Sequence, residues 1–496
     1  MTRARGVDTV ENVKQAQAVE KPRVVMIAYF FPPDGNAAVY RPLRFVRHLS
    51  ASHWAPTVVT VDGSSHERFD PQLLKTVPDT VGIKRVAGRD VWQAIQAWRA
   101  RRLQAQITGG AAEHVAKVYQ SQQRPWRRWA RNVVRTIEAS VYYPDHARFW
   151  IRAATAATVA VCHQTRPAVI VATGGPWSSF LVARAASRRT GVPYVLDFRD
   201  SWTLTCNDDF EARRPRWAAR QDRQVLSRLF RDAQAVIFRY DTEAECYWRA
   251  YQGTLSVDRI HIIPNGYEGA LETSPPPPGD RCTVLYAGTV TPYRYDTFLD
   301  ALSLLRADHP AEASRLRVLF VGEGGTAMAE AAAKRGLDDV IATMKPVPLH
   351  EVERLQQEAH ALLLLGVKPY QGYELCGSKV FGYLKASRPI LGVLPNDETR
   401  KVLERVGVTT IADIESPPAI VATIRRILES WSTHQLSALL PDVDACRWYS
   451  AESQTAALIP ALEGAPPINR FTPGIVNIPP SLHGKIGMNG WIAEQS

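Results

Sequence analysis

One lysine in the second half of the chain stands where a helix is expected to begin, which makes it a candidate anion ligand. The segment CGSKVFGYLKASRPILG, residues 376–392, has the pattern of a small-residue turn, a short helix and an apolar strand started by proline. Lys379 opens that helix, where its charge opposes the partial positive charge of a helix N-terminus. A bound phosphate group would resolve this conflict, so the segment raises the question of which anion binds there.

Other predicted strands in this half also end in glycines or charged residues. Glycine lets backbone N–H groups approach a ligand closely, and a cation holds phosphate charge. Each motif is weak alone, but together they place glycines and two cations on one rim, where a diphosphate could bind. The residues concerned are Gly288 and Arg294 in YAGTVTPYR, Gly322, Glu323 and Gly324 in VGEGG, and Glu374, Ser378 and Lys379 in ELCGSK.

The first half carries a comparable set of residues after its predicted strands. Each member also has a structural interpretation, namely a tight turn, a helix cap from Ser178 or Ser179, or a buried Arg–Asp pair. These alternatives stay open on the residues alone. The set comprises Gly35 and Asn36 in FFPPDGNAAVY, Gly174 and Gly175 in TGGPW, and Arg199, Asp200 and Trp202 in DFRDSW.

The elements that must position these residues alternate between short apolar runs and helical patterns. Such alternation predicts βαβ units and an α/β fold with doubly wound sheets. A Pro-rich stretch, TSPPPPGDR, interrupts the alternation, which then restarts and indicates a second domain of the same kind. The predicted strands lie at 23–30, 56–62, 168–175, 193–200, 235–240 and 258–266, and then at 283–288, 317–325, 360–367 and 389–393.

These patterns divide the chain into six segments. Because ligands of open α/β sheets bind outside the carboxyl ends of the strands, two such domains in tandem predict an interdomain cleft. The predicted segments are a polar N-terminal segment (1–22), a first Rossmann-like domain (23–272) with a basic insertion (about 91–143), a Pro-rich linker (273–280), a second Rossmann-like domain (281–445), a C-terminal helix (446–463) and a Pro/Gly-rich tail (464–496).

Composition narrows the protein class. The 496 residues are 45% hydrophobic, which suffices for two cores, and no apolar run approaches the ~18 residues of a membrane span. The N-terminus is polar and has no apolar signal-peptide core. The six cysteines are scattered without a CxxC pair, so we expect reduced thiols in a cytosolic protein and no zinc site. No DxD motif follows a strand, so no metal is expected.

The net charge of +11 is concentrated in one basic arm. Residues 91–137 contain nine Lys or Arg against a single acid, Glu113, which gives the segment +8. On a helix, its tryptophans would gather near one face and its arginines mostly elsewhere, as in an interfacial membrane helix. The alternative is an amphipathic helix whose tryptophans pack on the core. The expected membrane residues are Trp126, Arg127, Arg128, Trp129 and Arg131.

The order of these motifs resembles glycosyltransferase family 4, whose members have the GT-B fold of two facing Rossmann-like domains. The resemblance rests on YFFPPDGNAAVYRPLRFVRHL, GGPWSSFLVARAASRRTGVPYVLDFRDSW, IPNGYE, VLYAGTV, VLFVGEGG and GSKVFGYLKASRPIL, and covers about residues 21–463. It is closest to bacterial members that build surface polysaccharides and glycolipids. It implies a nucleotide-sugar donor bound mainly to the second domain and transfer with retention of configuration to a glycan or lipid-linked acceptor.

The resemblance also implies roles for individual residues. Lys379 matches the lysine that faces the donor diphosphate, Arg294 a weaker second contact, and Glu374 a glutamate near the donor sugar. Gly322 and Glu323 match the strand end where base and ribose lie. On the first domain, Gly35 matches the loop that meets the donor phosphates on closure, and Arg199 and Asp200 match an RD element beside the cleft.

Two departures from the family pattern bear on activity. Gly382 stands where a second glutamate usually contacts the donor ribose, and TGGPW stands where many members have a histidine near the sugar. Three other functions therefore remain alternatives: a sugar-nucleotide epimerase of the same fold, a catalytically weak partner subunit, and, outside enzymes, a nucleic-acid-binding protein suggested by charge alone. We expect a cytoplasmic protein that binds the inner face of the cell membrane peripherally.

Overall fold

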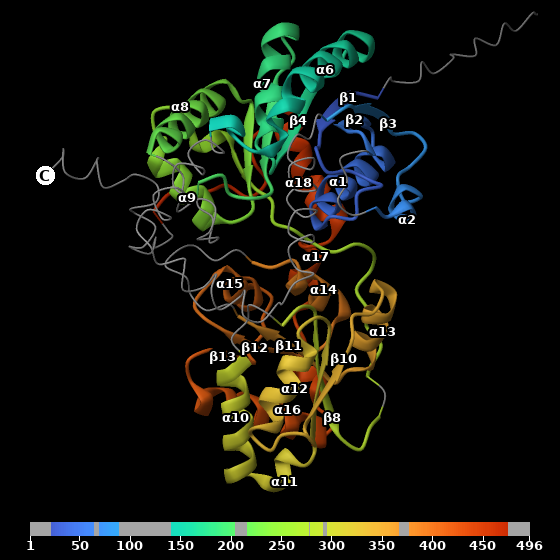
Figure 1. Ribbon diagram of the computed structural model, residues 1–496, viewed down its shortest axis with the longest axis vertical. Coiled ribbons are helices and arrows are strands. Elements are labelled where there is room, and N and C mark those ends of the chain that lie inside the picture. Colours follow the sequence, from blue (N-terminus) through green and yellow to red (C-terminus); the bar gives the residue numbers. More distant parts are fainter. Residues whose placement is uncertain are drawn as a thin grey trace, which may run out of the picture.

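The computed structural model describes residues 21–63, 69–88, 140–203, 216–276, 278–290, 295–366 and 376–474. Two parallel β-sheets flanked by helices form two α/β domains, the first above the second in Figure 1. This arrangement confirms the predicted fold class. Among the described residues, no helix combines the length and the apolar character needed to traverse a bilayer.

The first sheet has seven parallel strands in the order β3-β2-β1-β4-β5-β6-β7. The order reverses between β1 and β4, which creates a switch point where such sheets bind ligands. β4 and β5 are buried along their whole length, which explains their continuous apolar sequences. The strands are β1 (Arg23–Ile27), β2 (Ala55–Val61), β3 (Gly82–Val86), β4 (Val169–Gly174), β5 (Tyr194–Phe198), β6 (Ala235–Phe238) and β7 (Ile260–Ile262).

Helices cover both faces of this sheet (Figure 1). On α1, for example, Leu43, Val46 and Leu49 recur at helical spacing and are buried, whereas the opposite side is polar. The α-helices are α1 (Tyr40–Ala51), α2 (Pro71–Leu74), α6 (Ile151–Thr165), α7 (Ser178–Thr190), α8 (Arg216–Asp232) and α9 (Asp241–Ala250), and the 3₁₀ helices are η1 (Ala37–Val39), η3 (His146–Trp150) and η4 (Val257–Arg259).

The second sheet has six parallel strands in the order β10-β9-β8-β11-β12-β13. Its order reverses between β8 and β11, so the switch point lies where the chain leaves these two strands. Both strands are largely buried. The strands are β8 (Cys282–Ala287), β9 (Leu316–Val321), β10 (Ile341–Met344), β11 (Ala361–Leu365), β12 (Ile390–Leu394) and β13 (Ile411–Asp413).

The helices of the second half pack around this sheet, except for the last one. α10 and α16 lie against each other, and both contribute to one hydrophobic core with the strands. The helices are α10 (Tyr295–Asp308), α11 (Pro310–Ala313), α12 (Gly325–Ala333), α13 (Leu349–Glu358), α14 (Lys379–Ala386), α15 (Glu398–Arg405), α16 (Pro417–Ser432), η5 (Leu436–Leu439), α17 (Val443–Arg447) and α18 (Ala451–Glu463).

The chain crosses back to the first domain near its C-terminal end. The helix predicted at 446–463 is two helices, α17 and α18, because Ala451 N–H donates to the carbonyl of Tyr267 and extends the chain between them. α18 lies beside α1 in the upper domain of Figure 1, and Leu458 and Leu462 are buried in that domain's core. Residues 464–474, predicted to be irregular, include a β-bridge between Arg470 and His261 and a buried Phe471.

Side chains on α9 and α15 join the two domains. The ammonium of Lys401 lies 2.7 Å from the Glu398 carboxylate and donates to the Thr242 hydroxyl at 2.9 Å. Arg405 pairs with Asp241 across the same contact at 2.8 Å. Glu398 and Thr242 are buried, so the interdomain contact is a packed polar interface.

Three strands escaped the sequence analysis, namely β3, β10 and β13. All three are edge strands. They are only three to five residues long, and each leaves some of its side chains exposed. Their sequences, GIKRV, IATM and IAD, therefore lack the continuous apolar run that identifies a central parallel strand.

Candidate active site

Lys379 is the first residue of α14, as the sequence predicted, and α14 follows β11 at the switch point of the second sheet. Its ammonium nitrogen lies 3.6 Å from the centroid of the Tyr286 ring on β8. Burial lowers the pKa of Lys379 to about 7 because the charged form loses hydration. The ammonium is thus poorly solvated at the place where a donor phosphate is expected.

Gly288 and Gly322 leave room for this lysine and for each other. A Cβ atom on Gly288 would lie 2.9 Å from both Cε and Nζ of Lys379, and one on Gly322 would lie 2.2 Å from the Gly288 carbonyl oxygen. Their φ angles of 135° and 145° also disfavour any other residue. The two strand ends therefore need glycine to form.

The remaining donor-side residues fall into two groups. Gly324 has a φ of 87° and precedes α12, and the carbonyl of Glu323 accepts a 2.9 Å hydrogen bond from Val290 N–H. The structure thus brings Gly288, Gly322 and Lys379 together and ties the Glu323 backbone to the same loop. Glu374 and Arg294 lie outside the described residues.

The loop after β1 is organised by its own polar side chains. Asn36 accepts a hydrogen bond from Ala38 N–H at 3.0 Å and thereby caps η1, while Asp34 accepts one from Asn36 N–H at 2.7 Å. These are the contacts of a tight turn, the structural alternative for this loop. Gly35 lies between Asp34 and Asn36, in the loop between β1 and η1.

Gly174 and Gly175 close the end of β4 next to the first switch point. A Cβ on Gly174 would lie 2.5 Å from the Phe180 ring, and the carbonyl of Gly175 accepts a hydrogen bond from Arg199. Ser178 does not cap α7. Instead, its N–H and hydroxyl donate to the buried Asp145 carboxylate at 2.8 and 2.7 Å. Burial raises the pKa of Asp145.

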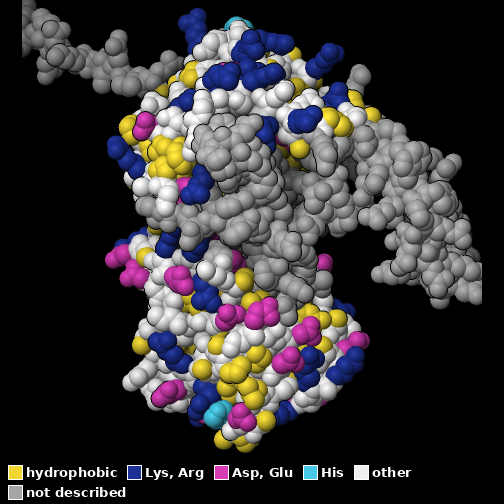
Figure 2. All heavy atoms as spheres, turned by 90° about the vertical axis from the view of Figure 1, so that its left-hand side faces the viewer, with side chains coloured by type: hydrophobic (Ala, Val, Ile, Leu, Met, Phe, Trp, Pro, Cys, Tyr) yellow, Lys and Arg dark blue, Asp and Glu magenta, His cyan; other side chains and the backbone are white. Residues whose placement is uncertain are grey.

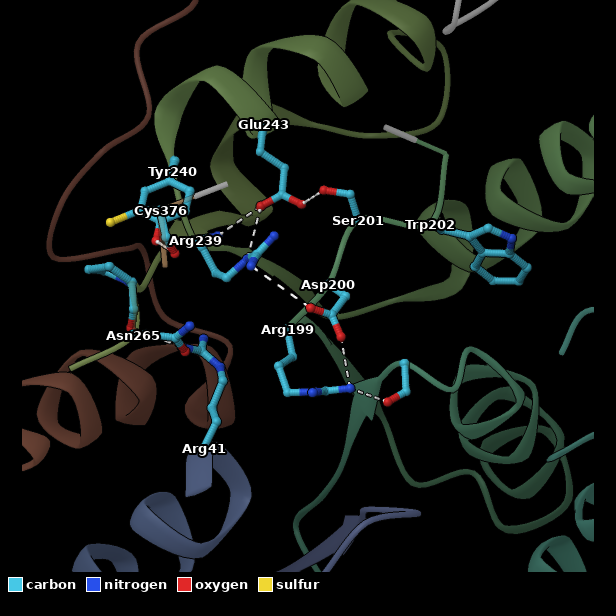
Figure 3. Close-up of polar contacts among 12 residues, drawn as sticks. Arg41, Arg199, Asp200, Ser201, Trp202, Arg239, Tyr240, Glu243, Asn265 and Cys376 are labelled. Atoms are coloured by element: carbon cyan, nitrogen blue, oxygen red, sulfur yellow. Dashed lines mark hydrogen bonds and ion pairs between the residues drawn. The ribbon is translucent and has the colours of Figure 1, made fainter. Parts of the chain in front are cut away.

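An ionic network occupies the carboxyl end of β5 and β6. Figure 3 shows Asp200 between two arginines: Arg199 Nη2 lies 2.8 Å from Asp200 Oδ2, and Arg239 Nη1 lies 4.0 Å from Oδ1. Glu243 lies 3.6 Å from Arg239 Nε and accepts a hydrogen bond from Ser201. Burial lowers the pKa of Arg199, and the Asp200 charge opposes that shift.

Asp200 is the member of this network that remains accessible. Its side chain is 42% exposed, whereas those of Arg239 and Glu243 are 4% and 0% exposed. The arginines hold the Asp200 carboxylate in place at the strand end. It can therefore accept a hydrogen bond from a substrate hydroxyl without first reorganising.

The structural alternative for this strand end, a buried Arg–Asp pair, forms between Asp197 and the distant Arg41. Nε and Nη2 of Arg41 on α1 both donate hydrogen bonds to the carboxylate of Asp197 on β5, at 2.8–3.1 Å. Both side chains are buried. Arg41 also donates to the carbonyls of Ile263 and Pro264, at 2.9 Å each. The pair thus joins α1, β5 and the loop after β7.

Trp202 was predicted to line the acceptor side of the cleft, and this is wrong. Its side chain is fully buried and stacks on Trp177, with ring centroids 5.6 Å apart. Its indole N–H donates to Asp222 at 3.2 Å, and its backbone N–H donates to the Tyr247 hydroxyl at 2.9 Å. A side chain without exposed surface cannot contact an acceptor, so Trp202 supports the loop that carries Arg199 and Asp200.

Four residues that organise the site were missed: Arg41, Asp145, Arg239 and Tyr286. Three of them, Arg41, Asp145 and Arg239, are charged residues within or next to apolar sequence, a signal that a buried ion pair or helix cap must follow. Tyr286 carried no such signal, because a tyrosine in a strand is ordinary.

The expected membrane residues, Trp126 to Arg131, lie outside the described residues. Within the described ranges, no group of three or more His, Cys, Asp or Glu could hold a metal ion.

Part of the chain is similar in sequence to a known protein family, and most of it is similar in structure to known proteins. Residues 87–266 match the family model of the glycosyl transferase 4-like domain, a span that includes β4 to β7 and the Arg199–Asp200 network. No curated protein matches the chain by sequence. Solved structures match it along most of its length.

Three of these structures illustrate the likeness. Sucrose-phosphate synthase from Thermosynechococcus elongatus is 12% identical, with 96% of this chain and 98% of that chain covered and a TM-score of 0.51. A variant of S. aureus TarM in complex with fondaparinux, alpha-GlcNAc-glycerol and UDP is 8% identical, with 89% and 99% covered and a TM-score of 0.52. The lipopolysaccharide outer core galactosyltransferase WaaB is 11% identical, with 89% and 99% covered and a TM-score of 0.50.

At such low identities the structures establish the fold, and the domain match adds the family resemblance. The fold is the predicted GT-B arrangement of two Rossmann-like domains. The chain therefore has the GT-B fold, and its residues 87–266 are similar to the glycosyl transferase 4-like domain.

Proposed function

We propose that the protein transfers a sugar from a nucleoside-diphosphate sugar to a glycan or lipid-linked acceptor, with retention of configuration, in the synthesis of cell-surface polysaccharide or glycolipid. The observation that carries the donor part is the position of Lys379, poorly solvated beside Gly288 at the switch point of the second sheet. The TarM complex, which contains UDP, supports a nucleotide donor for this fold. Retention and the acceptor class rest on the resemblance to family 4.

In this proposal, Lys379 stabilises the negative charge that develops on the diphosphate as the bond to the sugar breaks. Backbone N–H groups at the glycine-lined strand ends supply further donors. The leaving phosphate can take the proton of the acceptor hydroxyl, so no protein base is required. Glu374 near the donor sugar and Arg294 on the phosphates complete the proposed catalytic set, and Asp200 orients the acceptor from the first domain.

Calorimetric titration with UDP, GDP, TDP and ADP tests the donor site and identifies the base. We expect one nucleotide to bind preferentially and Lys379→Ala to lose that binding. Products formed from the corresponding nucleotide sugars then separate the remaining alternatives. An isomerised sugar nucleotide formed without any acceptor would indicate the epimerase, and binding without turnover would indicate a partner subunit.

The proposed transfer needs no metal ion, since Lys379 and backbone donors neutralise the diphosphate charge. We therefore expect activity to change less than about twofold after treatment with EDTA and removal of the chelate, because no step depends on a divalent cation. The measurement is kcat/KM before and after treatment, with Mg²⁺ and Mn²⁺ re-addition as the control. A loss of activity that either metal restores would contradict the metal-free proposal.

Peripheral membrane binding is part of the proposal, because a lipid-linked acceptor would lie at the bilayer. In the face shown in Figure 2, Lys and Arg side chains gather over the upper, first domain. In the described part of this domain, Val141, Phe149 and Trp217 are exposed, and Phe149 and Trp217 line a cavity of about 670 Å³ with Arg148 and Arg152. Apolar and basic side chains together suit an anionic lipid surface.

Vesicle sedimentation tests this surface. We expect the wild-type protein to pellet with anionic vesicles and to be released by salt, because each cation near such a bilayer contributes about 1 kcal/mol. Reversing Arg127, Arg128 and Arg131 to Glu should abolish pelleting. A matched variant reverses the exposed Lys75, Arg188 and Arg189 and should still bind. Equal pelleting of wild type and the arm variant would refute the membrane surface.

A further inference from the structure

The ring of Tyr286 lies against Lys379, the lysine of the proposed donor site. Its ring face lies 3.6 Å from the ammonium nitrogen of Lys379, which is cation–π contact. The two residues come from different elements, β8 and α14, on either side of the second switch point. Gly288, two residues after Tyr286, leaves the space that the end of the lysine occupies.

The tyrosine is itself held on two sides. It is fully buried, and its ring packs against Phe320 on the neighbouring strand β9, with ring centroids 5.3 Å apart. Its hydroxyl donates to the carbonyl of Thr289 at 2.7 Å. The ring therefore cannot turn away from the lysine without breaking a hydrogen bond and core packing.

Two features of this place disfavour a positive charge. The N-terminus of α14 repels it, and burial removes its hydration. An aromatic face attracts a cation more strongly when water is excluded. Among the described residues, the Tyr383 hydroxyl accepts a hydrogen bond from Ala287 N–H, next to Tyr286, at 3.0 Å, and the buried Cys376 thiol, whose pKa burial raises to about 12, lies three residues before Lys379. The charged pair Lys385–Glu353 joins α14 to α13 farther along the helix.

We propose that Tyr286 is a positioning residue that holds the Lys379 ammonium over its ring face, ready for the donor diphosphate. This inference rests on the proposed donor site. It assigns to Tyr286 two separable tasks: the ring stabilises the charged lysine, and the hydroxyl fixes the ring through Thr289. The donor phosphates then meet a charge that is already placed, so less ordering is required at binding.

Three variants separate these tasks. Tyr286→Leu removes the aromatic face, Tyr286→Phe keeps it and removes only the hydroxyl, and Phe320→Leu removes a neighbouring ring of the same core. Phe320→Leu controls for loss of packing, because the two rings are paired across β8 and β9. Circular dichroism and thermal unfolding establish that each variant is folded before binding is measured.

The readout is binding of inorganic pyrophosphate and of UDP by calorimetry between pH 6 and 9, with the lysine pKa followed by NMR of its ε-carbon. We expect Tyr286→Leu to lower that pKa and to weaken binding at pH 8 by about two- to thirtyfold, the range of a cation–π contact. The loss should shrink at pH 6, where the lysine is protonated in both proteins. Tyr286→Phe and Phe320→Leu should each stay within about threefold of wild type.

The outcomes distinguish this inference from the proposed function. If Lys379→Ala abolishes binding but Tyr286→Leu and Phe320→Leu behave alike at every pH, the donor site stands and the role of Tyr286 is overturned. A Lys379 pKa that is unchanged or raised in Tyr286→Leu overturns it as well. If Lys379→Ala leaves binding intact, the donor site itself is wrong. If Tyr286→Leu does not fold, Tyr286→Phe provides the test. Loss of pH-dependent binding in Tyr286→Phe would overturn the claim that the ring, rather than the hydroxyl, holds the lysine.

Discussion

Replacing Lys379 by alanine is expected to lower kcat/KM for the nucleotide sugar by about 10²–10³-fold, the cost of removing one preorganised charge-stabilising donor. The reason is the position of the ammonium at the second switch point, where the proposed function places the leaving diphosphate. Lys385 provides the matched control, since it lies on the same helix and pairs with Glu353 at 2.8 Å, away from the strand ends. Lys385→Ala should retain activity within about threefold.

The same lysine should make donor binding depend on pH. Burial lowers its pKa to about 7, so it is largely protonated at pH 6 and largely neutral at pH 8. Because only the charged form attracts the diphosphate, affinity should be constant below pH 7 and fall roughly tenfold per pH unit above it. Nucleotide titrations at pH 6, 7, 8 and 9 measure this slope. A flat profile, or loss of binding at the acidic end, would contradict the assignment.

Protonation of Lys379 should also affect the stability of the fold. Stability should rise with pH, whereas donor affinity should fall. The unfolded chain binds a proton on this lysine up to its ordinary pKa, above 10, whereas the folded protein binds it only below about 7. Between these values the unfolded state carries the extra proton, so the contribution of Lys379 to stability rises with pH. Lys379→Met should therefore raise the unfolding temperature at pH 6 while it abolishes donor binding.

The second large effect is expected at Arg41, whose loss leaves a buried carboxylate without its partner. Arg41 and Asp197 are 3% and 1% exposed, so Arg41→Ala should destabilise the first domain by about 3–5 kcal/mol. Urea unfolding followed by tryptophan fluorescence measures the change in free energy of unfolding. The exposed pair Arg184–Asp232, with 24% and 35% exposure, is the control, and Arg184→Ala should cost less than about 1 kcal/mol.

A double variant separates the ion pair from the geometry that it sets. In Arg41→Met with Asp197→Leu, no uncompensated charge remains, so most of the lost stability should return. The contacts of Arg41 to the carbonyls of Ile263 and Pro264 are still absent in that protein. We therefore expect a folded protein with reduced activity. If Arg41→Ala alone costs no more than Arg184→Ala, the pair does not organise the first domain.

Local sequence determined much of this protein. Hydrophobic runs identified the central strands, including β1, β4 and β5, because a strand buried on both faces must be apolar throughout. The pattern around residues 376–392 placed Lys379 at the first position of a helix, which is where it lies. The glycines after β8 and β9 were also recognisable from the sequence as candidate site residues. Only glycine tolerates the close backbone approaches at these strand ends.

Tertiary structure decided which side chains meet. Arg41 and Asp197 are 156 residues apart, and no local pattern specifies that they pair. Trp202 follows a strand end just as Asp200 does, yet it turns into the core, because Trp177 and Asp222 offer it an apolar face and an acceptor. The edge strands β3, β10 and β13 form only because a neighbouring strand supplies their hydrogen bonds.

The candidate site divides along the same line. The residues that could carry the chemistry, such as Lys379 and Asp200, are recognisable in the sequence, because each is a charged residue near an apolar strand. The residues that hold them, such as Tyr286 on β8 and Arg239 directly after β6, come from elements that meet them only after the chain has folded. Their side-chain types are compatible with an ordinary core, so burial and neighbours, which belong to the folded chain alone, determine their roles.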